Sequence, residues 1–318
     1  MKVVAVAGGT GHVGRPIVES LAQSQSFKVL VLGRKTSQDT SGLPASAVYI
    51  QVDYDNVEAL SQILKHHNVH TLICTIQITD ETASSAQVNL IRASDSSSTV
   101  KRFIVSAWGS LPNEELELTS HDRSPAAAFQ AASIEQLRRT NLEWTRFAVG
   151  FFLDYYGMPN IKTHLPMLTF ALDIPHKKAA IPGTGDEPIS FTYTYDVAKF
   201  VAAFLDETGW EELTVCYGER TTWNSFLKIA EEVSGQPFEV TYDSVESLQR
   251  GAVSELPSQK AELVASPFPE AIAKQLLAIL GIWAVNGQFD IQHNKSLNAK
   301  YPDIKPMAVR DALLIGMK

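Results

Sequence analysis

The chain of 318 residues carries 27 lysines and arginines against 35 aspartates and glutamates, which gives a formal net charge of −8 at pH 7. This acidic balance and the lack of any basic run argue against a nucleic-acid-binding protein. The longest apolar stretch, residues 272–285, is interrupted by Lys274, Gln275 and Gly281 and is too short to cross a bilayer. With no secretory leader before the first predicted strand, we expect a cytoplasmic protein that does not act at a membrane.

The amino-terminal residues show the pattern of a dinucleotide-binding βαβ unit. Apolar runs at residues 3–7 and 28–32 predict two buried strands, and Ile17, Leu21 and Ala22 predict a helix between them. The loop before this helix is lined with glycines, so its free N–H groups and the helix dipole would attract a pyrophosphate. A purely structural turn is the alternative, but the surrounding strands and helix favour dinucleotide binding. The loop residues are Gly8, Gly9, Thr10, Gly11, His12, Val13 and Gly14.

The end of the second predicted strand indicates which dinucleotide is bound. An NAD site places an aspartate or glutamate there to accept hydrogen bonds from the adenine ribose. This chain has Arg34 and Lys35 instead, and its next acidic residue is Asp39. A guanidinium can hold a phosphate through two parallel hydrogen bonds, and a lysine adds a positive charge. The sequence therefore predicts NADP(H); the alternative is a pair of solvated cations on a loop.

Strands and helices alternate through the rest of the first half of the chain. This order predicts an α/β fold, a Rossmann-type doubly wound parallel sheet with helices on both faces. We expect it to form an NADP(H)-binding domain over residues 1–150. Its further strands are predicted at 47–53, 71–75, 102–106 and 145–149, and its further helices at 57–64, 85–93 and 124–139.

After Gly150 the sequence becomes aromatic and irregular, and the strict alternation ends. We expect residues 151–318 to form a smaller α+β domain, mainly for substrate binding, with some segments returning to the Rossmann sheet. Asp196 is predicted to cap a helix that runs to Leu205. Two strands are predicted on either side of a turn at 181–186, the second of them at 189–193, and a further strand is predicted at 238–242. Helices are predicted at 223–233, 244–250, 269–285 and after Pro306.

Three further signals are interpreted as structural. Cys74 and Cys216 lie in apolar runs and are expected in the core. The histidine cluster at 66–70 lacks companion cysteine or acidic ligands, so a solvated helix end is favoured over a metal site. Tyr195 and Lys199 have the YxxxK spacing of short-chain dehydrogenases but lie far from the glycine loop, and we interpret them as structural or surface residues.

Four motifs together resemble one known family. They are the glycine loop, the Arg34-Lys35 pair, the segment KRFIVSAWG at 101–109, and LEWTRF at 142–147 followed by aromatic residues. The chain resembles the NmrA-like, isoflavone-reductase-like branch of the atypical short-chain dehydrogenases, and its fungal members in particular. The resemblance covers essentially the whole chain.

This resemblance implies NADPH as the cofactor and assigns its contacts. The glycine loop would hold the pyrophosphate, and Arg34 and Lys35 the 2′-phosphate. The remaining implied contacts are Asp53 and Tyr54 at the adenine, Thr75, Ile76 and Gln77 along the nicotinamide half, Ser106 and Ala107 below it, and Val149, Gly150, Phe151 and Phe152 on the inner wall.

One position departs from the family pattern. Reductases of this family carry a lysine on the helix before the sixth strand, and counting along the chain places Gln130 there. A glutamine forms hydrogen bonds but has no titrating proton. Either another group protonates the product, or the substrate needs no strong acid, or no hydride transfer occurs. His121 is the titrating candidate to replace the lysine, although it also fits a plain polar loop, and Tyr155 is a weaker candidate.

Three functions remain open from the sequence. The first is an NADPH-dependent reductase of an apolar, aromatic or polyketide-like small molecule of secondary metabolism. The second is a non-redox isomerase or cyclase on the same scaffold. The third is an NADP(H)-sensing regulator without turnover, the only one of the three that requires a protein partner. Besides the inner-wall phenylalanines, the expected substrate contacts are Trp108, Tyr155, Tyr156, Met158 and His164.

Overall fold

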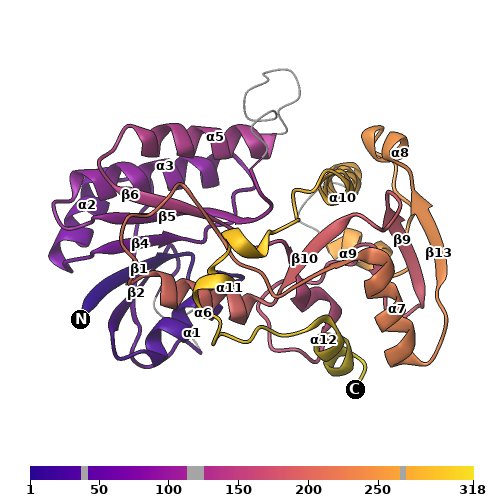
Figure 1. Ribbon diagram of the computed structural model, residues 1–318. Coiled ribbons are helices and arrows are strands. Elements are labelled where there is room, and N and C mark those ends of the chain that lie inside the picture. Colours follow the sequence, from indigo (N-terminus) through magenta and orange to yellow (C-terminus); the bar gives the residue numbers. More distant parts are fainter. Residues whose placement is uncertain (37–41, 113–124, 266–269) are drawn as a thin grey trace. The chain divides into compact units, whose positions relative to one another are not determined.

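The computed structural model describes residues 1–36, 42–112, 125–265 and 270–318 (Figure 1). Its contacts divide the chain into two units, which are considered separately. The first contains residues 1–108, 112–148 and 197–215, and the second contains 109–111, 149–196 and 216–318.

The first unit is built on a seven-stranded parallel sheet. Its strands are rich in buried valine, leucine and isoleucine, as expected when helices cover both faces of a sheet. The predicted Rossmann-type α/β fold is confirmed. In their order across the sheet, the strands are β11 (Leu213–Val215), β6 (Glu143–Ala148), β5 (Arg102–Gly109), β4 (Thr71–Cys74), β1 (Lys2–Ala7), β2 (Phe27–Gly33) and β3 (Val48–Gln51).

Helices cover both faces of this sheet, as Figure 1 shows. Three helices lie on one face: α2 (Val57–His66), α3 (Glu81–Ser96) and α5 (Pro125–Arg138). On the other face lie α1 (Gly14–Gln23) and α6 (Thr194–Phe204), which begins among residues of the second unit. Amphipathic spacing explains this packing, since Ile17, Val18 and Leu21 of α1 are fully buried against the sheet.

Side-chain caps decide where several helices begin. Helix α3 starts four residues before the predicted 85–93 segment because the Asp80 carboxylate accepts a hydrogen bond from Ala83 N. Helix α6 starts at Thr194, two residues before the expected cap Asp196. The cap comes from elsewhere in the chain: Asp154 accepts hydrogen bonds from both the N–H and the hydroxyl of Thr194. Asp196 instead accepts a hydrogen bond from Met307 N.

The second unit contains two small three-stranded sheets, so the strands on either side of the turn at 181–186 belong to different sheets. One sheet, in strand order, consists of β12 (Glu219–Thr222), β10 (Pro188–Thr192) and β7 (Phe151–Phe152). The other consists of β13 (Glu239–Asp243), β9 (Lys178–Pro182) and β8 (Leu172–Asp173). The helices of this unit are η2 (Leu153–Tyr156), α7 (Trp223–Ser234), α8 (Val245–Gln249), α9 (Gln259–Ala265), α10 (Glu270–Val285), η3 (His293–Lys295), α11 (Leu297–Lys300) and α12 (Val309–Gly316).

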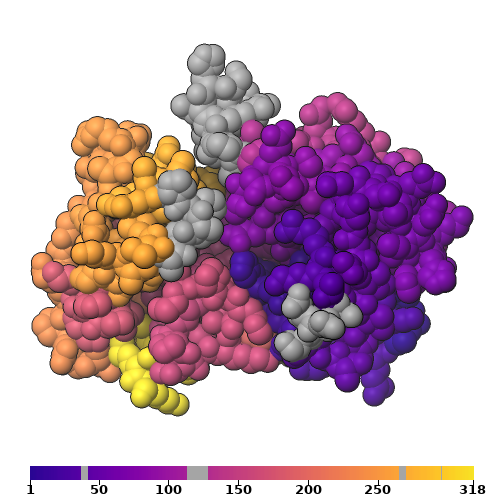
Figure 2. Space-filling view, turned by 180° about the vertical axis from the view of Figure 1, so that it is seen from behind, coloured from indigo at the N-terminus to yellow at the C-terminus, as the bar shows by residue number. Residues whose placement is uncertain are grey.

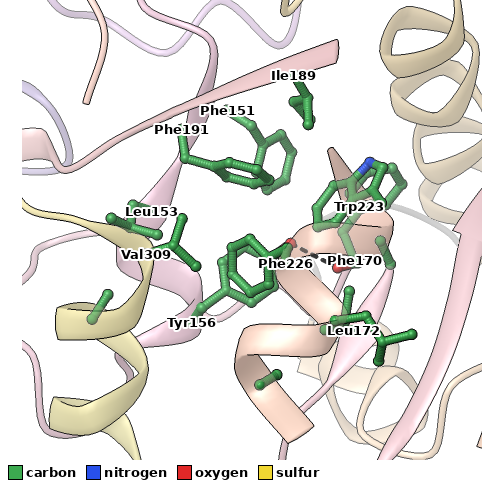
Figure 3. Close-up of a cluster of buried hydrophobic side chains, with 14 of the residues drawn as sticks. Phe151, Leu153, Tyr156, Phe170, Leu172, Ile189, Phe191, Trp223, Phe226 and Val309 are labelled. Carbon is green, nitrogen blue, oxygen red and sulfur yellow. Dashed lines mark hydrogen bonds between the residues drawn. The ribbon is translucent and has the colours of Figure 1, made fainter. Parts of the chain in front are cut away.

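An aromatic cluster fills the core of the second unit (Figure 3). The Trp223 and Phe191 rings pack edge to face with centroids 5.0 Å apart, a favourable geometry for aromatic pairs. The C-terminal helix α12 adds Val309 to this cluster, and the carboxyl-terminal residues lie on the surface of the unit, yellow in Figure 2. Within the described ranges, no helix has the length and apolar character needed to cross a membrane.

Candidate cofactor-binding site

The strand order places the glycine loop at a switch point of the sheet. From β1 the chain proceeds to β2 and β3 on one side, then returns to β4 on the other side of β1. The loops that leave β1 and β4 therefore diverge, and the space outside the carboxyl ends of such strands is where open α/β sheets bind ligands. Residues 8–14 leave β1 at this point.

The loop glycines have different roles. A Cβ atom on Gly14 would lie 2.3 Å from Thr75 Oγ1 and 2.6 Å from Gly8 O, so this glycine permits close packing of helix and strand. Gly8 has φ +79°, a left-handed conformation that favours glycine. A Cβ on Gly11 would meet no atom within 4 Å. The backbone at Gly11 is thus open to a ligand, as a closely approaching pyrophosphate requires.

The start of α1 is suited to an anion. The helix has no side-chain cap and no acidic residue in its first turn. Arg15 N donates to Gly11 O, Ile17 N donates to Val13 O, and Pro16 has no N–H, so an anion would meet the N–H groups of the loop and of Gly14. His12 of the loop adopts φ +43°, and burial lowers the pKa of its imidazole, which keeps the ring neutral at pH 7. Together with the open backbone at Gly11, this end of the helix fits a dinucleotide phosphate.

The loop after β2 presents its two cations to solvent. The side chains of Arg34 and Lys35 are exposed, while their backbone carbonyl groups accept hydrogen bonds from side chains of β3. Gln51 Nε2 donates a hydrogen bond to Arg34 O at 3.3 Å, and Tyr49 Oη donates to Lys35 O at 2.8 Å. The backbone is therefore fixed, and the two cationic side chains are available to a phosphate.

Two residues predicted at the adenine differ in environment. Asp53 is exposed and accepts a hydrogen bond from Asp55 N. Tyr54 is buried in the core of the sheet, and its hydroxyl donates to Leu32 O at 2.9 Å. Both the ring and the hydroxyl of Tyr54 are thus engaged within the protein, and its adenine contact stays a prediction.

The predicted nicotinamide contacts lie at the carboxyl ends of β4 and β5. The Thr75 hydroxyl donates to Ala7 O at 2.7 Å, and the Ser106 hydroxyl donates to Ile76 O at 2.8 Å. Both hydroxyls join neighbouring strand ends and shape the rim of the sheet. Gln77 is exposed and Ala107 half-buried beside them.

Trp108, predicted to contact substrate, lies at the same rim. Its indole N–H donates to Cys74 O at 3.0 Å, and its ring stacks on Phe147 with centroids 5.4 Å apart. The ring is therefore held in one orientation and is half-buried.

Both cysteines of the chain, Cys74 and Cys216, are buried free thiols.

Gln130 is held in a chain of hydrogen bonds that sequence reasoning missed. Its Nε2 donates to Ser106 O at 2.7 Å, and Ser106 N donates to Gln87 Oε1 at 2.7 Å. Gln87 Nε2 then donates to Ser133 Oγ. Because the Ser106 carbonyl only accepts, the orientation of the Gln130 amide is fixed, and its Oε1 is buried with no hydrogen-bond partner in the described residues. A polar Gln87 on the apolar face of the predicted helix 85–93 was the available sequence signal.

Two aromatic residues predicted to contact ligands belong to the core of the second unit. Phe151 is 4% exposed and packs against several rings, including Trp223 at 6.2 Å. Tyr156 is 3% exposed, and its hydroxyl donates to Phe170 O at 2.8 Å, the dashed line in Figure 3. The alternating aromatic sequence does not reveal which rings turn inward, and these two do. Both rings therefore pack within the core of this unit, and their ligand contacts stay predictions.

Gly150 and Val149 are fixed by backbone contacts within the second unit. The N–H groups of both residues donate to Gly109 O. Gly150 has φ +74°, and a Cβ there would lie 2.2 Å from Ser190 O, so a side chain is excluded. Val149 is buried, and its carbonyl accepts a hydrogen bond from the Thr192 hydroxyl.

The remaining predicted contacts of the second unit are partly exposed. Phe152 and Tyr155 are half-buried. Burial raises the pKa of the Tyr155 hydroxyl, which makes it a weaker proton donor. His164 Nε2 lies 3.3 Å from Tyr195 Oη. Met158 lines a surface groove of about 510 Å³. His121, the predicted replacement for the family lysine, lies outside the described residues.

The other histidines show no metal-binding arrangement. His66 ends α2, and its ring meets that of His67 edge to face at 4.8 Å. In the parts of the chain that the structure describes, no group of three histidine, cysteine or acidic side chains could hold a metal ion.

Lys199 of the YxxxK pair is exposed on α6.

Comparison with known proteins decides the family. The model of the NmrA-like family matches residues 1–310. The chain belongs to the NmrA-like family. An oxidoreductase of Botryotinia fuckeliana, BOA1, is 32% identical over 306 residues, covering 95% of each chain. The isoflavone reductase homolog IRL of Zea mays is 25% identical and covers 98% of this chain and 96% of its own.

Solved structures share the fold of this NmrA-like chain. A structure of AtPrR2 with NADP+ and (+)pinoresinol has a TM-score of 0.75 at 19% identity, covering 99% of this chain and 98% of that one. The family model and the BOA1 relative confirm the predicted membership of the NmrA-like group.

Proposed function

We propose that the protein is an NADPH-dependent reductase of an apolar, aromatic or polyketide-like small molecule. The observation that carries the proposal is the combination, in one unit, of an open Gly11 backbone at an uncapped helix start and two exposed cations at the end of β2. The first element suits a pyrophosphate and the second a ribose 2′-phosphate. The oxidoreductase BOA1 and the NADP+ complex of AtPrR2 support this function by similarity.

When bound, NADPH supplies a hydride to the substrate. The chain's own residues would hold the pyrophosphate at the glycine loop and the 2′-phosphate at Arg34 and Lys35. Ser106 and Thr75 keep the ends of neighbouring strands together at the rim where the nicotinamide half is proposed to lie. Preorganised groups of this kind orient reactants without moving during the reaction.

The source of the proton distinguishes this chain within the proposed function. Gln130 holds no titratable proton, and one of its two amide N–H groups is donated to Ser106 O. Burial raises the pKa of Tyr155, which makes it a poor acid at neutral pH. We therefore propose that the proton comes from His121 or from water.

The hydrogen bond from the Gln130 amide to Ser106 O also favours a second candidate function. A protein that binds NADP(H) and reports it to a partner, or an isomerase that binds its substrate by shape, needs no acid at this position. Incubation with NADPH and aromatic or polyketide-like carbonyl compounds, followed by absorbance at the nicotinamide band, separates these functions. Consumption of NADPH supports the reductase, whereas product formed without consumption, or binding of both cofactor forms without turnover, contradicts it.

Substitution of Arg34 by alanine tests the cofactor assignment. We expect the Kd for NADP+ to rise about 10- to 100-fold, because a charge-assisted contact to the 2′-phosphate is lost. The Kd for NAD+ should change less than about twofold, since NAD+ has no such phosphate. Titration calorimetry measures both constants.

Arg92→Ala is the matched control because Arg92 is an exposed arginine on α3. It should leave both constants unchanged. Equal losses for NADP+ and NAD+ in Arg34→Ala would contradict the phosphate assignment.

A further inference from the structure

A surface groove of about 510 Å³ lies within the second unit, and its volume falls in the range of small-molecule sites. The end of η2 and the residues after it contribute 156–159, and the turn between β8 and β9 contributes 174–177. The ends of α7 and α12 contribute 233–236 and 316–317. The groove is therefore complete without any residue of the unit that carries the proposed coenzyme site.

Hydrogen bonds and close packing hold the walls of this groove in place. Tyr156 Oη donates to Phe170 O at 2.8 Å, and a Cβ on Gly316 would lie 2.7 Å from Tyr156 O, so α12 meets η2 at backbone contact. The turn between β8 and β9 follows Asp173, a fully buried carboxylate that accepts a hydrogen bond from Ser258 N at 2.8 Å. The groove is thus largely pre-formed, and a ligand would pay little to order it.

The lining of the groove is mainly apolar and carries one charge. Half-buried side chains of Met158, Ile174, Val233 and Met317 supply the apolar surface. Methionine side chains adapt to ligands of different shape, which suits a binding surface. Lys177 is the single charged residue among the described residues that line the groove. A molecule with an apolar body and one anionic group complements this lining.

Lys177 is held in a conformation that few lysines adopt. Its φ is +55°, in the left-handed region that non-glycine residues rarely enter and that is found more often at ligand contacts. Its Nζ donates to Ile174 O at 2.8 Å, which uses one of three N–H donors. It forms no ion pair with another residue of the described ranges. The ammonium group can therefore pair with a carboxylate from outside the chain.

We propose that this groove is a second ligand site, which binds a small amphipathic carboxylate. The carboxylate pairs with Lys177, and the apolar body lies on Met158, Ile174 and Met317. A carboxylate is favoured over a neutral ligand because a hydrogen bond between two charged groups is roughly twice as strong as a neutral one. An amine is disfavoured because its charge has the same sign as that of Lys177. The inference does not depend on the proposed reductase activity.

Calorimetric titration with octanoate tests the site, and 1-octanol is the matched probe with the same chain and no charge. We expect octanoate to bind the wild-type protein. In Lys177→Met, which keeps the aliphatic stem, its Kd should rise about tenfold or more, as for the loss of a hydrogen bond to a charged group. The Kd for 1-octanol should stay within about twofold, since the hydroxyl has no charge to lose. Lys228→Met removes an exposed lysine of α7 outside the lining and should change neither constant.

A second pair of variants changes the charge of the groove and leaves Lys177 in place. Gln236 is exposed and lines the groove, so Gln236→Glu and Gln236→Lys add opposite charges with little change in packing. We expect octanoate to bind about two- to fivefold more weakly to Gln236→Glu and more tightly to Gln236→Lys, as for exposed ion pairs. Both effects should shrink as the salt concentration rises. These variants keep the proposal testable if Lys177→Met fails to fold.

Several results would overturn the assignment of this groove. They are the absence of octanoate binding to the wild type, an unchanged octanoate affinity in Lys177→Met, and equal losses for octanoate and 1-octanol. Displacement of octanoate by NADP+ would place the probe at the coenzyme site and contradict the proposal as well. A dimer in sedimentation experiments that Gln236→Lys dissociates would assign the groove to a second copy of the chain instead. Failure to bind NADP+ would refute the proposed function and leave this inference standing.

Discussion

Alanine at Gly14 is expected to destabilise the protein by about 2–3 kcal/mol, as overpacking does in a well-packed region, and to abolish NADP+ binding. The new methyl group would meet Thr75 Oγ1 at 2.3 Å and Gly8 O at 2.6 Å. Neither atom can withdraw freely, because Thr75 donates to Ala7 O and Gly8 belongs to the loop itself. Urea unfolding followed by circular dichroism measures the change in stability.

Gly11→Ala is the matched control for this prediction. A Cβ at Gly11 meets no atom within 4 Å, so we expect wild-type stability. The methyl group would nevertheless occupy the space through which a pyrophosphate approaches, and NADP+ should bind at least about tenfold more weakly. A Gly14→Ala protein with wild-type stability and cofactor affinity would contradict the packing role assigned to this glycine.

Alanine at Asp154 is expected to cost about 3 kcal/mol or more, since several buried donors lose their acceptor. The carboxylate is fully buried and accepts hydrogen bonds from Thr194 N, Thr194 Oγ1 and Thr163 Oγ1. Asp154→Asn should cost less, because the threonine hydroxyls can rotate to accept from the amide while its oxygen still accepts from Thr194 N. Thermal and urea unfolding of both variants tests this order. Equal stability of wild type and Asp154→Ala would show that the carboxylate does not hold the start of α6.

The pKa of Asp154 also predicts the direction in which stability changes with pH. Burial raises the pKa of Asp154 in the folded protein above its value in the unfolded chain. The folded state therefore binds this proton more tightly, and the Asp154 contribution to stability falls as the pH rises from about 4 through the raised pKa. Asp154→Asn lacks this dependence, so the stability difference between it and the wild type should shift across that range.

Periodicity predicted the central architecture because it reflects burial along each element. The strands around 71–75 and 102–106 and the helix at 57–64 all occur in the structure. The short edge strand 213–215 was not individually predicted, since three residues have no measurable period. The start of α6 was misplaced because its cap, Asp154, lies 40 residues away in the chain.

The site was predictable where local chemistry defines it. The glycine loop and the Arg34-Lys35 pair each lie within a few residues of a strand end, so the sequence alone locates them. The burial of Tyr54, Phe151 and Tyr156 could not be predicted in this way, because an aromatic ring has the same sequence signature in a core as in a pocket. The Gln87 and Gln130 amides meet only through Ser106, a relation that depends on the packing of α3 and α5 against β5.

The anchoring of residues 34 and 35 from β3 has a consequence for the evolution of coenzyme preference. Because Gln51 and Tyr49 hold the peptide carbonyls and not the side chains, the course of the loop does not depend on which residues occupy these two positions. Under the proposed phosphate assignment, exchange between phosphorylated and unphosphorylated coenzymes would need only substitutions at these two positions, with the scaffold inherited intact.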